Sequence, residues 1–222
     1  MRNILIGNKK RYKLHPIDVS MDTEELRKEY SKKEEIIKNR LKEFENVKEE
    51  EWFYELCFCI LTPQSTARGA DRAIKSLKKL DFKSKDFDPT PYLLGEIRFQ
   101  NNKGKYLIEA KNKFNEIKEE IKNSKNSKEL RDWLVKNVKG YGLKESGHFL
   151  RNIGHKDLAI LDRHILKNLV KLKVINEVPK SLTPKIYFEI EEKFKKFSNE
   201  VGIKMDELDL LFWSMEAGEV FK

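Results

Sequence analysis

The residue types best suited to chemistry lie in the second half of the chain. Lys144 directly follows a turn with two alternating glycines, Gly140 and Gly142, and Asp162 stands 18 positions after it. Glycine alone takes a positive φ without steric cost, so this pattern favours a tight hairpin between helices. Such a turn directs backbone N–H groups outward at the start of the next helix, where a phosphate binds. A plain glycine-capped turn is the structural alternative.

Asp162 follows the apolar run Leu158–Leu161 and precedes a segment with helical periodicity. We therefore expect it to be partly buried at a helix start, where an aspartate also serves as an N-cap. A lysine attacks carbon only as the neutral amine, so a desolvated cleft would be needed to make Lys144 a nucleophile. Asp162 would then stabilise the positive charge that develops at the attacked carbon and help the Lys144 amine lose its proton. The alternatives are a phosphate-binding surface lysine and an ordinary helix cap.

The composition fits a folded protein with a polyanionic partner. Of 222 residues, 39% are hydrophobic and 37% charged, with a formal net charge of +9. A positive excess favours binding to phosphate backbones, although a Lys/Glu-rich, heat-adapted surface explains it equally well. The only cysteines, Cys57 and Cys59, lie in an apolar run and are expected to be buried thiols. No apolar run suits a membrane span or a signal peptide, so we expect a cytoplasmic protein.

The apolar residues repeat with helical periodicity almost throughout, which predicts an all-α fold. A polar loop is expected at Gln100–Asn102. Ser65 or Thr66 is expected to cap the third helix, and Thr90 with Pro91 to open a short one. The other expected helices cover roughly residues 22–44, 51–61, 66–77, 106–121, 127–138, 162–172, 184–198 and 206–217, with one more beginning after Gly142.

A lysine at a glycine hairpin followed by such an aspartate resembles the helix-hairpin-helix DNA glycosylase superfamily. The segment Ile60–Thr66 looks like the one that places a glutamine near the strand opposite a lesion. The stretch Lys144–Asn152 and the tail Leu210–Lys222 are similar to 8-oxoguanine glycosylases of the Ogg2 type. The resemblance covers roughly residues 51–222 and leaves out the first twenty. The four-cysteine cluster of the endonuclease III branch is missing, which favours an oxidised purine over a pyrimidine.

This resemblance implies two helical subdomains with the active cleft between them. One would span residues 56–155 and contain the helix-hairpin-helix motif, and the other would join residues 21–55 to 156–222. Residues 1–20 would be an N-terminal extension. The implied partner is double-stranded DNA with a damaged base or an abasic site, bound by a monomer. A monovalent cation at the hairpin is the one ion that the resemblance suggests; no other cofactor or metal is expected.

The resemblance also implies roles for single residues. Lys144 would displace the base through an imine, and the strand would then be cut by β-elimination, with Asp162 assisting. Gly140 and Gly142 would bind phosphate, while Gln64 would fill the gap left by a flipped base. Phe99 would act as a wedge between bases, or it is a core residue. Trp213 would act as a platform for the extruded base, or it is a core residue. Lys222 would act as a sensor of 8-oxoguanine.

The remaining alternatives are a pyrimidine-directed glycosylase/lyase and a non-catalytic DNA-binding module. The module would explain the charge and the glycines but gives no reason for Lys144 or Asp162. His148, His155 and His164 lack the spacing of metal ligands, and we expect them at the surface or against the DNA backbone.

Overall fold

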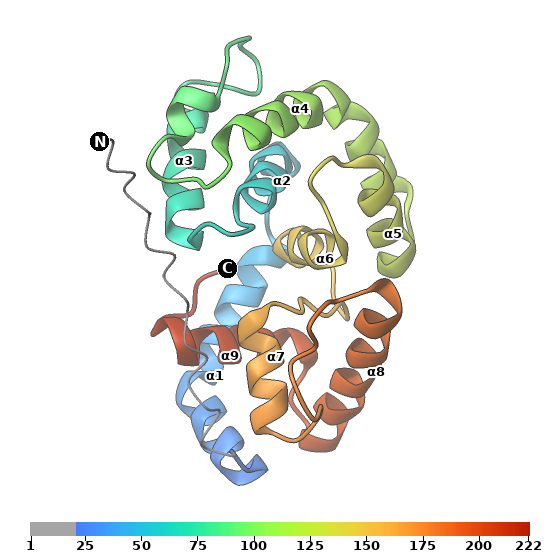
Figure 1. Cartoon of the computed structure of the whole chain (residues 1–222). Helices are drawn as coiled ribbons and strands as arrows, with labels where there is room; N and C mark the ends of the chain where they lie inside the picture. Colours follow the sequence, from blue (N-terminus) through green and yellow to red (C-terminus); the bar gives the residue numbers. More distant parts are fainter. Residues whose placement is uncertain (1–20) are drawn as a thin grey trace, which may run out of the picture.

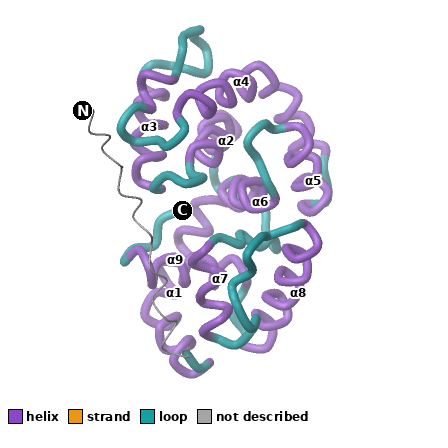
Figure 2. The backbone as a smooth tube through the Cα atoms, in the orientation of Figure 1, coloured by secondary structure: helices purple, strands orange, loops and turns teal. Residues whose placement is uncertain are grey.

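The computed structural model describes residues 21–222, and every regular element within that range is a helix, which confirms the predicted fold class (Figures 1 and 2). The predicted extension, residues 1–20, lies outside the described residues. The elements are α1 (Thr23–Glu45), η1 (Glu49–Glu51), α2 (Trp52–Leu61), α3 (Ala67–Lys79), η2 (Thr90–Leu93), α4 (Gln100–Asn123), α5 (Ser127–Asn137), α6 (Leu143–Asn152), α7 (Arg163–Lys171), α8 (Pro184–Val201) and α9 (Met205–Ala217).

The helix starts follow the capping chemistry of the sequence. Asp22 accepts the Glu25 N–H at 2.8 Å ahead of α1. Thr66, rather than Ser65, caps α3 by accepting the Gly69 N–H at 3.0 Å. Each cap satisfies a backbone donor that has no partner inside its own helix. The sequence therefore locates these helix starts to within a residue.

The predicted loop at Gln100–Asn102 is wrong, because these residues form the first turn of α4. Phe99 takes a left-handed backbone with φ of 59°, which redirects the chain. Its carbonyl then accepts the Asn102 and Lys103 N–H groups at 3.1 and 3.0 Å. Polar side chains are well tolerated in a first helical turn, where they remain in water, so their polarity does not mark a loop. The short helix opened by Thr90 is a single 3-10 segment that ends at Leu93.

The buried side chains form two clusters. One gathers α2 to α6 together with Leu158 and Phe221, and the other gathers α1 and α7 to α9. Between α6 and α7 the chain changes from the first cluster to the second at Leu158 and Ala159. The subdomain boundaries of residues 56–155 and of 21–55 with 156–222 stay a prediction about folding units. Figure 1 shows α6 in the middle, between the two groups of helices, with the C-terminus ending close to it.

Helix α2 is the central element of the first cluster and is buried along most of its length. Cys57 and Cys59 lie fully inside it as free thiols, as predicted. Burial raises the pKa of both thiols far above the ordinary range, so neither is a reactive thiolate. None of the helices among residues 21–222 is long and apolar enough to cross a membrane.

Candidate active site

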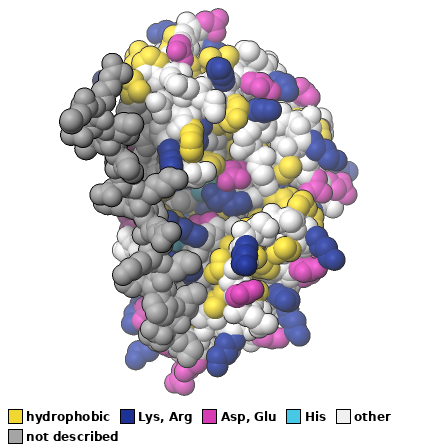
Figure 3. Space-filling model, viewed as in Figure 1, with side chains coloured by type: hydrophobic (Ala, Val, Ile, Leu, Met, Phe, Trp, Pro, Cys, Tyr) yellow, Lys and Arg dark blue, Asp and Glu magenta, His cyan; other side chains and the backbone are white. Residues whose placement is uncertain are grey.

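A cleft of about 1110 Å³ opens where the two groups of helices meet. It is lined by the loop before α3, the segment ahead of α4, one face of α6, the start of α7, and α9 with the tail. The cleft brings together five of the residues singled out in the sequence, namely Gln64, Lys144, Asp162, Trp213 and Lys222. On the face shown in Figure 3, basic side chains lie around the boundary between the two groups of helices. Phe99 and the two hairpin glycines are not among the lining residues.

The hairpin is the turn between α5 and α6, and its shape depends on Gly140. That residue has a φ of +89°, and a Cβ there would lie 2.8 Å from the Tyr106 ring. Glycine is therefore required twice, by backbone conformation and by space. Gly142 has a φ of −112°, which any residue can adopt. Tyr141 anchors the turn to α2 by donating its hydroxyl to the Leu56 carbonyl at 2.9 Å.

The hairpin offers fewer outward N–H groups than the glycine pattern suggests. The Tyr141 N–H is donated to the Val138 carbonyl at 3.2 Å. The Gly142 N–H is donated to the Glu145 carboxylate, also at 3.2 Å. A phosphate that used the Gly142 N–H would have to displace Glu145, whereas Gly140 lies exposed at the tip of the turn.

Lys144 is the second residue of α6, and 23% of its side chain is exposed toward the cleft. Its ammonium lies 3.7 Å from the Glu145 carboxylate. Asp162 caps α7, because its Oδ1 accepts the N–H groups of His164 and Ile165 at 2.7 and 2.9 Å. Both cap bonds use the same oxygen, so Oδ2 takes no part in the cap. The two expected roles of Asp162, a helix cap and a cleft residue, are compatible in one geometry.

His148 does not lie at the surface, which was one of its two expected positions; contact with the DNA backbone, the other, stays a prediction. His148 is 6% exposed and lines the cleft one helical turn after Lys144, on the same face of α6. Neither ring nitrogen has a hydrogen-bond partner among residues 21–222. Burial, and next the Arg151 charge, hold the pKa of His148 well below its usual range, so the ring is neutral. His155 and His164 are partly buried, and His155 Nδ1 lies 2.9 Å from the Ser127 hydroxyl.

A buried ion pair lies beside His148. Arg151 Nη1 is 3.1 Å from Asp209 Oδ2, and both residues line the cleft. Burial raises the pKa of Asp209 to about 7, although the Arg151 charge opposes the rise. The two residues stand 58 positions apart, so no local signal in the sequence links this arginine to this aspartate. Among residues 21–222, no group of three or more His, Cys, Asp or Glu side chains could hold a metal ion.

The C-terminal tail packs against the core. Phe221 is 9% exposed, its ring centroid lies 6.2 Å from that of Trp213, and the Arg68 guanidinium lies 4.0 Å from it. Lys222 then turns into the cleft, where its ammonium lies 2.7 Å from Glu55 Oε1. Trp213 is only partly buried and lines the cleft, so it is not a simple core residue.

Two exposed residues flank the cleft mouth in strained backbone conformations. Gln64 and Phe99 have φ of 57° and 59°, in the left-handed region that favours glycine. Phe99 is 50% exposed, which rules out the core alternative. The loop with Gln64 is held by Lys103, whose ammonium donates to the Leu61 and Pro63 carbonyls at 2.7 and 2.6 Å.

Lys103 also connects this loop to the turn with Phe99. Its ammonium lies 3.1 Å from the Ser65 hydroxyl, and that hydroxyl accepts the Arg98 N–H at 3.0 Å. One buried lysine therefore holds both strained turns of the mouth. No sequence signal separated it from the many other lysines of the chain.

The all-helical fold, the glycine hairpin ahead of α6 and the cleft that holds Lys144 and Asp162 define a helix-hairpin-helix DNA glycosylase. A family model described as "8-oxoguanine DNA glycosylase" matches residues 37–203. The chain belongs to this 8-oxoguanine DNA glycosylase family.

Relatives and solved structures agree with that membership. The chain is 49% identical over 210 residues to an "8-oxoguanine DNA glycosylase/AP lyase" of Fusobacterium nucleatum, covering 89% of this chain and 96% of that protein. It is 41% identical over 193 residues to the protein of the same name from Methanocaldococcus jannaschii, covering 85% and 92%. A crystal structure of an M. jannaschii 8-oxoguanine glycosylase/lyase with a 15mer DNA containing 8-oxoguanine matches with a TM-score of 0.80 and 39% identity, covering 89% and 99%.

Proposed function

We propose that this protein removes 8-oxoguanine from DNA and then cleaves the strand at the resulting abasic site. The single observation that carries the proposal is that one cleft holds Lys144, from the hairpin helix, and Asp162, from the start of α7. Family membership and relatives named as glycosylase/AP lyases support the same reaction. A non-catalytic DNA-binding module has no use for a lysine and a carboxylate brought together in one cleft.

The reaction begins when the damaged nucleotide leaves the stack and enters the cleft. The neutral Lys144 amine attacks C1′ of the sugar, and the bond between C1′ and the base breaks. Asp162 stabilises the positive charge that develops on the sugar and accepts the amine proton. The released base takes up a proton. The C1′–O4′ bond then breaks, O4′ takes a proton, and the opened sugar is left joined to Lys144 by an imine at C1′. Because the imine withdraws electrons, a C2′ proton is lost and the 3′ phosphate leaves, which cuts the strand.

The other residues would bind DNA around this centre. Gly140, which is exposed, would approach a phosphate, while Gln64 and Phe99 would enter the gap left by the flipped nucleotide. The partly exposed Trp213 offers a face for stacking against the extruded base. Lys222 enters the same cleft, where its ammonium would donate to the C8 oxygen that 8-oxoguanine has and guanine lacks.

The proposed enzyme acts as a monomer on double-stranded DNA, in the cytoplasm, and its chemistry uses no cofactor. A monovalent cation at the hairpin stays a prediction. The Val138 and Gly142 carbonyls of that turn already accept the Tyr141 and Ser146 N–H groups at 3.2 and 3.0 Å. No step of the proposed reaction depends on the ion.

Borohydride trapping tests the proposal, because the reductant fixes an imine as a permanent protein–DNA bond. The protein should form a trapped adduct with a duplex containing 8-oxoguanine, and none with the undamaged duplex. A panel with oxidised pyrimidines separates the main alternative, a pyrimidine-directed glycosylase/lyase. An adduct with thymine glycol alone would support that alternative, and binding without any adduct would support a non-catalytic module.

A further inference from the structure

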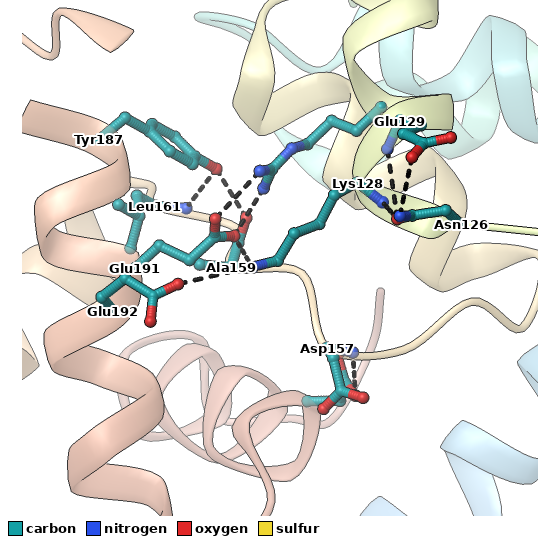
Figure 4. A network of polar contacts seen from close by, with 11 residues as sticks. Asn126, Lys128, Glu129, Asp157, Ala159, Leu161, Tyr187, Glu191 and Glu192 are labelled. Carbon is teal, nitrogen blue, oxygen red and sulfur yellow. Dashed lines mark hydrogen bonds and ion pairs between the residues drawn. The ribbon is translucent and has the colours of Figure 1, made fainter. Parts of the chain in front are cut away.

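The segment that ends in Asp162 is held by side chains of α8, a helix that contributes no residue to the lining of the cleft. Figure 4 shows Tyr187 and Glu191 of this helix beside Ala159 and Leu161. Tyr187 donates its hydroxyl to the Ala159 carbonyl at 2.6 Å, and the Leu161 N–H points to the same hydroxyl oxygen at 3.4 Å. Glu191 accepts the Ala159 N–H at 2.8 Å. Three backbone groups immediately ahead of Asp162 are thus fixed by two side chains from a single helix.

These contacts are buried, and Glu191 also forms an ion pair with Arg131 of the other group of helices. Glu191 is 2% exposed and accepts both terminal nitrogens of Arg131, at 2.5 and 3.0 Å. Arg131, on α5, is 1% exposed. A buried carboxylate is stable as an ion only with such a partner. The pair therefore links α5 to α8 behind the cleft and keeps Glu191 in place beside Ala159.

The same segment also packs against the helix that carries Lys144. Gly147 lies one turn after Lys144, and a Cβ on it would be 3.0 Å from the Ala159 carbonyl oxygen. The absent side chain lets the segment approach α6 closely. Contacts on α6 and on α8 therefore hold Ala159 from two sides, three residues before Asp162.

We propose that Tyr187 and Glu191 are positioning residues that fix Asp162 relative to Lys144. This inference rests on the proposed function, since it assigns Asp162 and Lys144 to one reaction. Neither α8 residue lines the cleft, so they act through the backbone of Ala159 and Leu161 rather than on DNA. Small displacements of a catalytic group can slow a reaction by about 100-fold while leaving substrate binding intact.

Tyr187→Phe is the direct test, because it removes the hydroxyl and keeps the ring. Its matched control is Tyr30→Phe, which removes another buried hydroxyl bond, from Tyr30 in α1 to Glu207 in α9 at 2.8 Å. Neither residue of the control bond lines the cleft. Single-turnover rates would be measured with saturating enzyme on an 8-oxoguanine duplex and on a preformed abasic site, alongside DNA affinity and thermal stability.

We expect Tyr187→Phe to lower both rates by about tenfold or more with unchanged DNA affinity, while Tyr30→Phe lowers stability alone. Equal rates in the two variants would overturn the inference, and so would a loss of DNA affinity without a loss of rate. Gly147→Ala is a second test that removes no hydrogen bond. It should also slow the chemical step, because the added methyl displaces the Ala159 carbonyl, and an unchanged rate would contradict the inference.

Failure of the proposed function gives a different result. In that case the wild-type protein itself forms no borohydride-trapped adduct. If the wild type is trapped while Tyr187→Phe behaves like Tyr30→Phe, only the positioning role is wrong.

Discussion

Lys144 and Lys103 lie in neighbouring regions of one molecule and have opposite surroundings. Lys103 is 5% exposed, and its ammonium lies within 3.1 Å of two carbonyls and a hydroxyl. Lys144 lines the cleft, and its ammonium has one neighbouring carboxylate, at 3.7 Å. An ammonium has three donors, so Lys103 is fully engaged by the protein. The Lys144 amine is held much more loosely and is available to a substrate.

The difference shows what separates a structural lysine from a reactive one. Burial alone does not make a nucleophile, since Lys103 is the more buried of the two. A nucleophile must also have access to the reacting atom and few competing acceptors. We therefore assign covalent chemistry to Lys144 and a holding role in the cleft mouth to Lys103.

The largest expected effect comes from replacing Lys144, with a separate replacement of Lys103 for comparison. Lys144→Gln should abolish both strand cleavage and borohydride trapping, while damaged DNA still binds, because the phosphate contacts lie elsewhere. Lys103→Met should still form the trapped adduct. Two results would contradict the assignment of covalent chemistry to Lys144. One is a trapped adduct with the Lys144 variant, and the other is loss of the adduct in the Lys103 variant alone.

Asp162→Asn should produce the next largest loss. Asparagine caps helices as well as aspartate does, so thermal stability should change little. The lost charge should slow single-turnover base excision by about 10²- to 10³-fold, since one preorganised electrostatic contact contributes that much to a transition state. Turnover close to that of the wild type would reduce Asp162 to a helix cap.

The fold class was predictable from the sequence, as was the pairing of Lys144 with Asp162 that the structure places in one cleft, because their signals are local. Helical periodicity and capping residues mark the helices, and Lys144, next to the hairpin, stands only 18 positions before Asp162. What the sequence did not reveal depends on distant partners. Lys103 reaches residues 38 to 42 positions away, and Tyr187 reaches back 28 positions to Ala159. No spacing rule links such residues, so only the packed structure separates them from other lysines and tyrosines.

Two structural predictions were wrong, and each has its own physical reason. Asn101 and Asn102 are polar in composition, yet a first helical turn accommodates them. His148 looked like a surface residue because the neighbouring helix faces were unknown. Its position four residues after Lys144 on one helix was the signal that would have placed it in the cleft.

Deleting Lys222 sharpens the comparison by removing a third lysine, which we assign to recognition. Its ammonium lies in the cleft beside Glu55, and under the proposed function it contacts the extruded base rather than the sugar. We expect excision of 8-oxoguanine to fall about tenfold or more, the loss of roughly one charge-assisted hydrogen bond. Lyase activity on a preformed abasic site should be spared. Equal losses on both substrates would mean that the tail serves folding.

The smallest effect on catalysis should come from Lys103→Met, whose main effect is on stability. The variant leaves the Leu61 and Pro63 carbonyls without their donor, which should cost about 1–3 kcal/mol. In a protein of this size that corresponds to a fall in melting temperature of several degrees. Excision of 8-oxoguanine should decrease only a few-fold, through looser placement of Gln64. A variant as stable as the wild type would refute the holding role.

The pH dependence of this stability difference gives an independent check. Burial, the largest cause, lowers the pKa of Lys103 to about 8, whereas an unfolded lysine has a pKa of about 10.4. Between these two values the unfolded chain binds more protons than the folded protein, so this group makes the wild type more stable as pH rises. The methionine variant lacks the group, and the advantage of the wild type over it should therefore grow from about pH 8 to pH 10. Melting curves of both proteins across that range measure the trend, and an advantage that shrinks with rising pH would mean that Lys103 holds the mouth mainly through its charge.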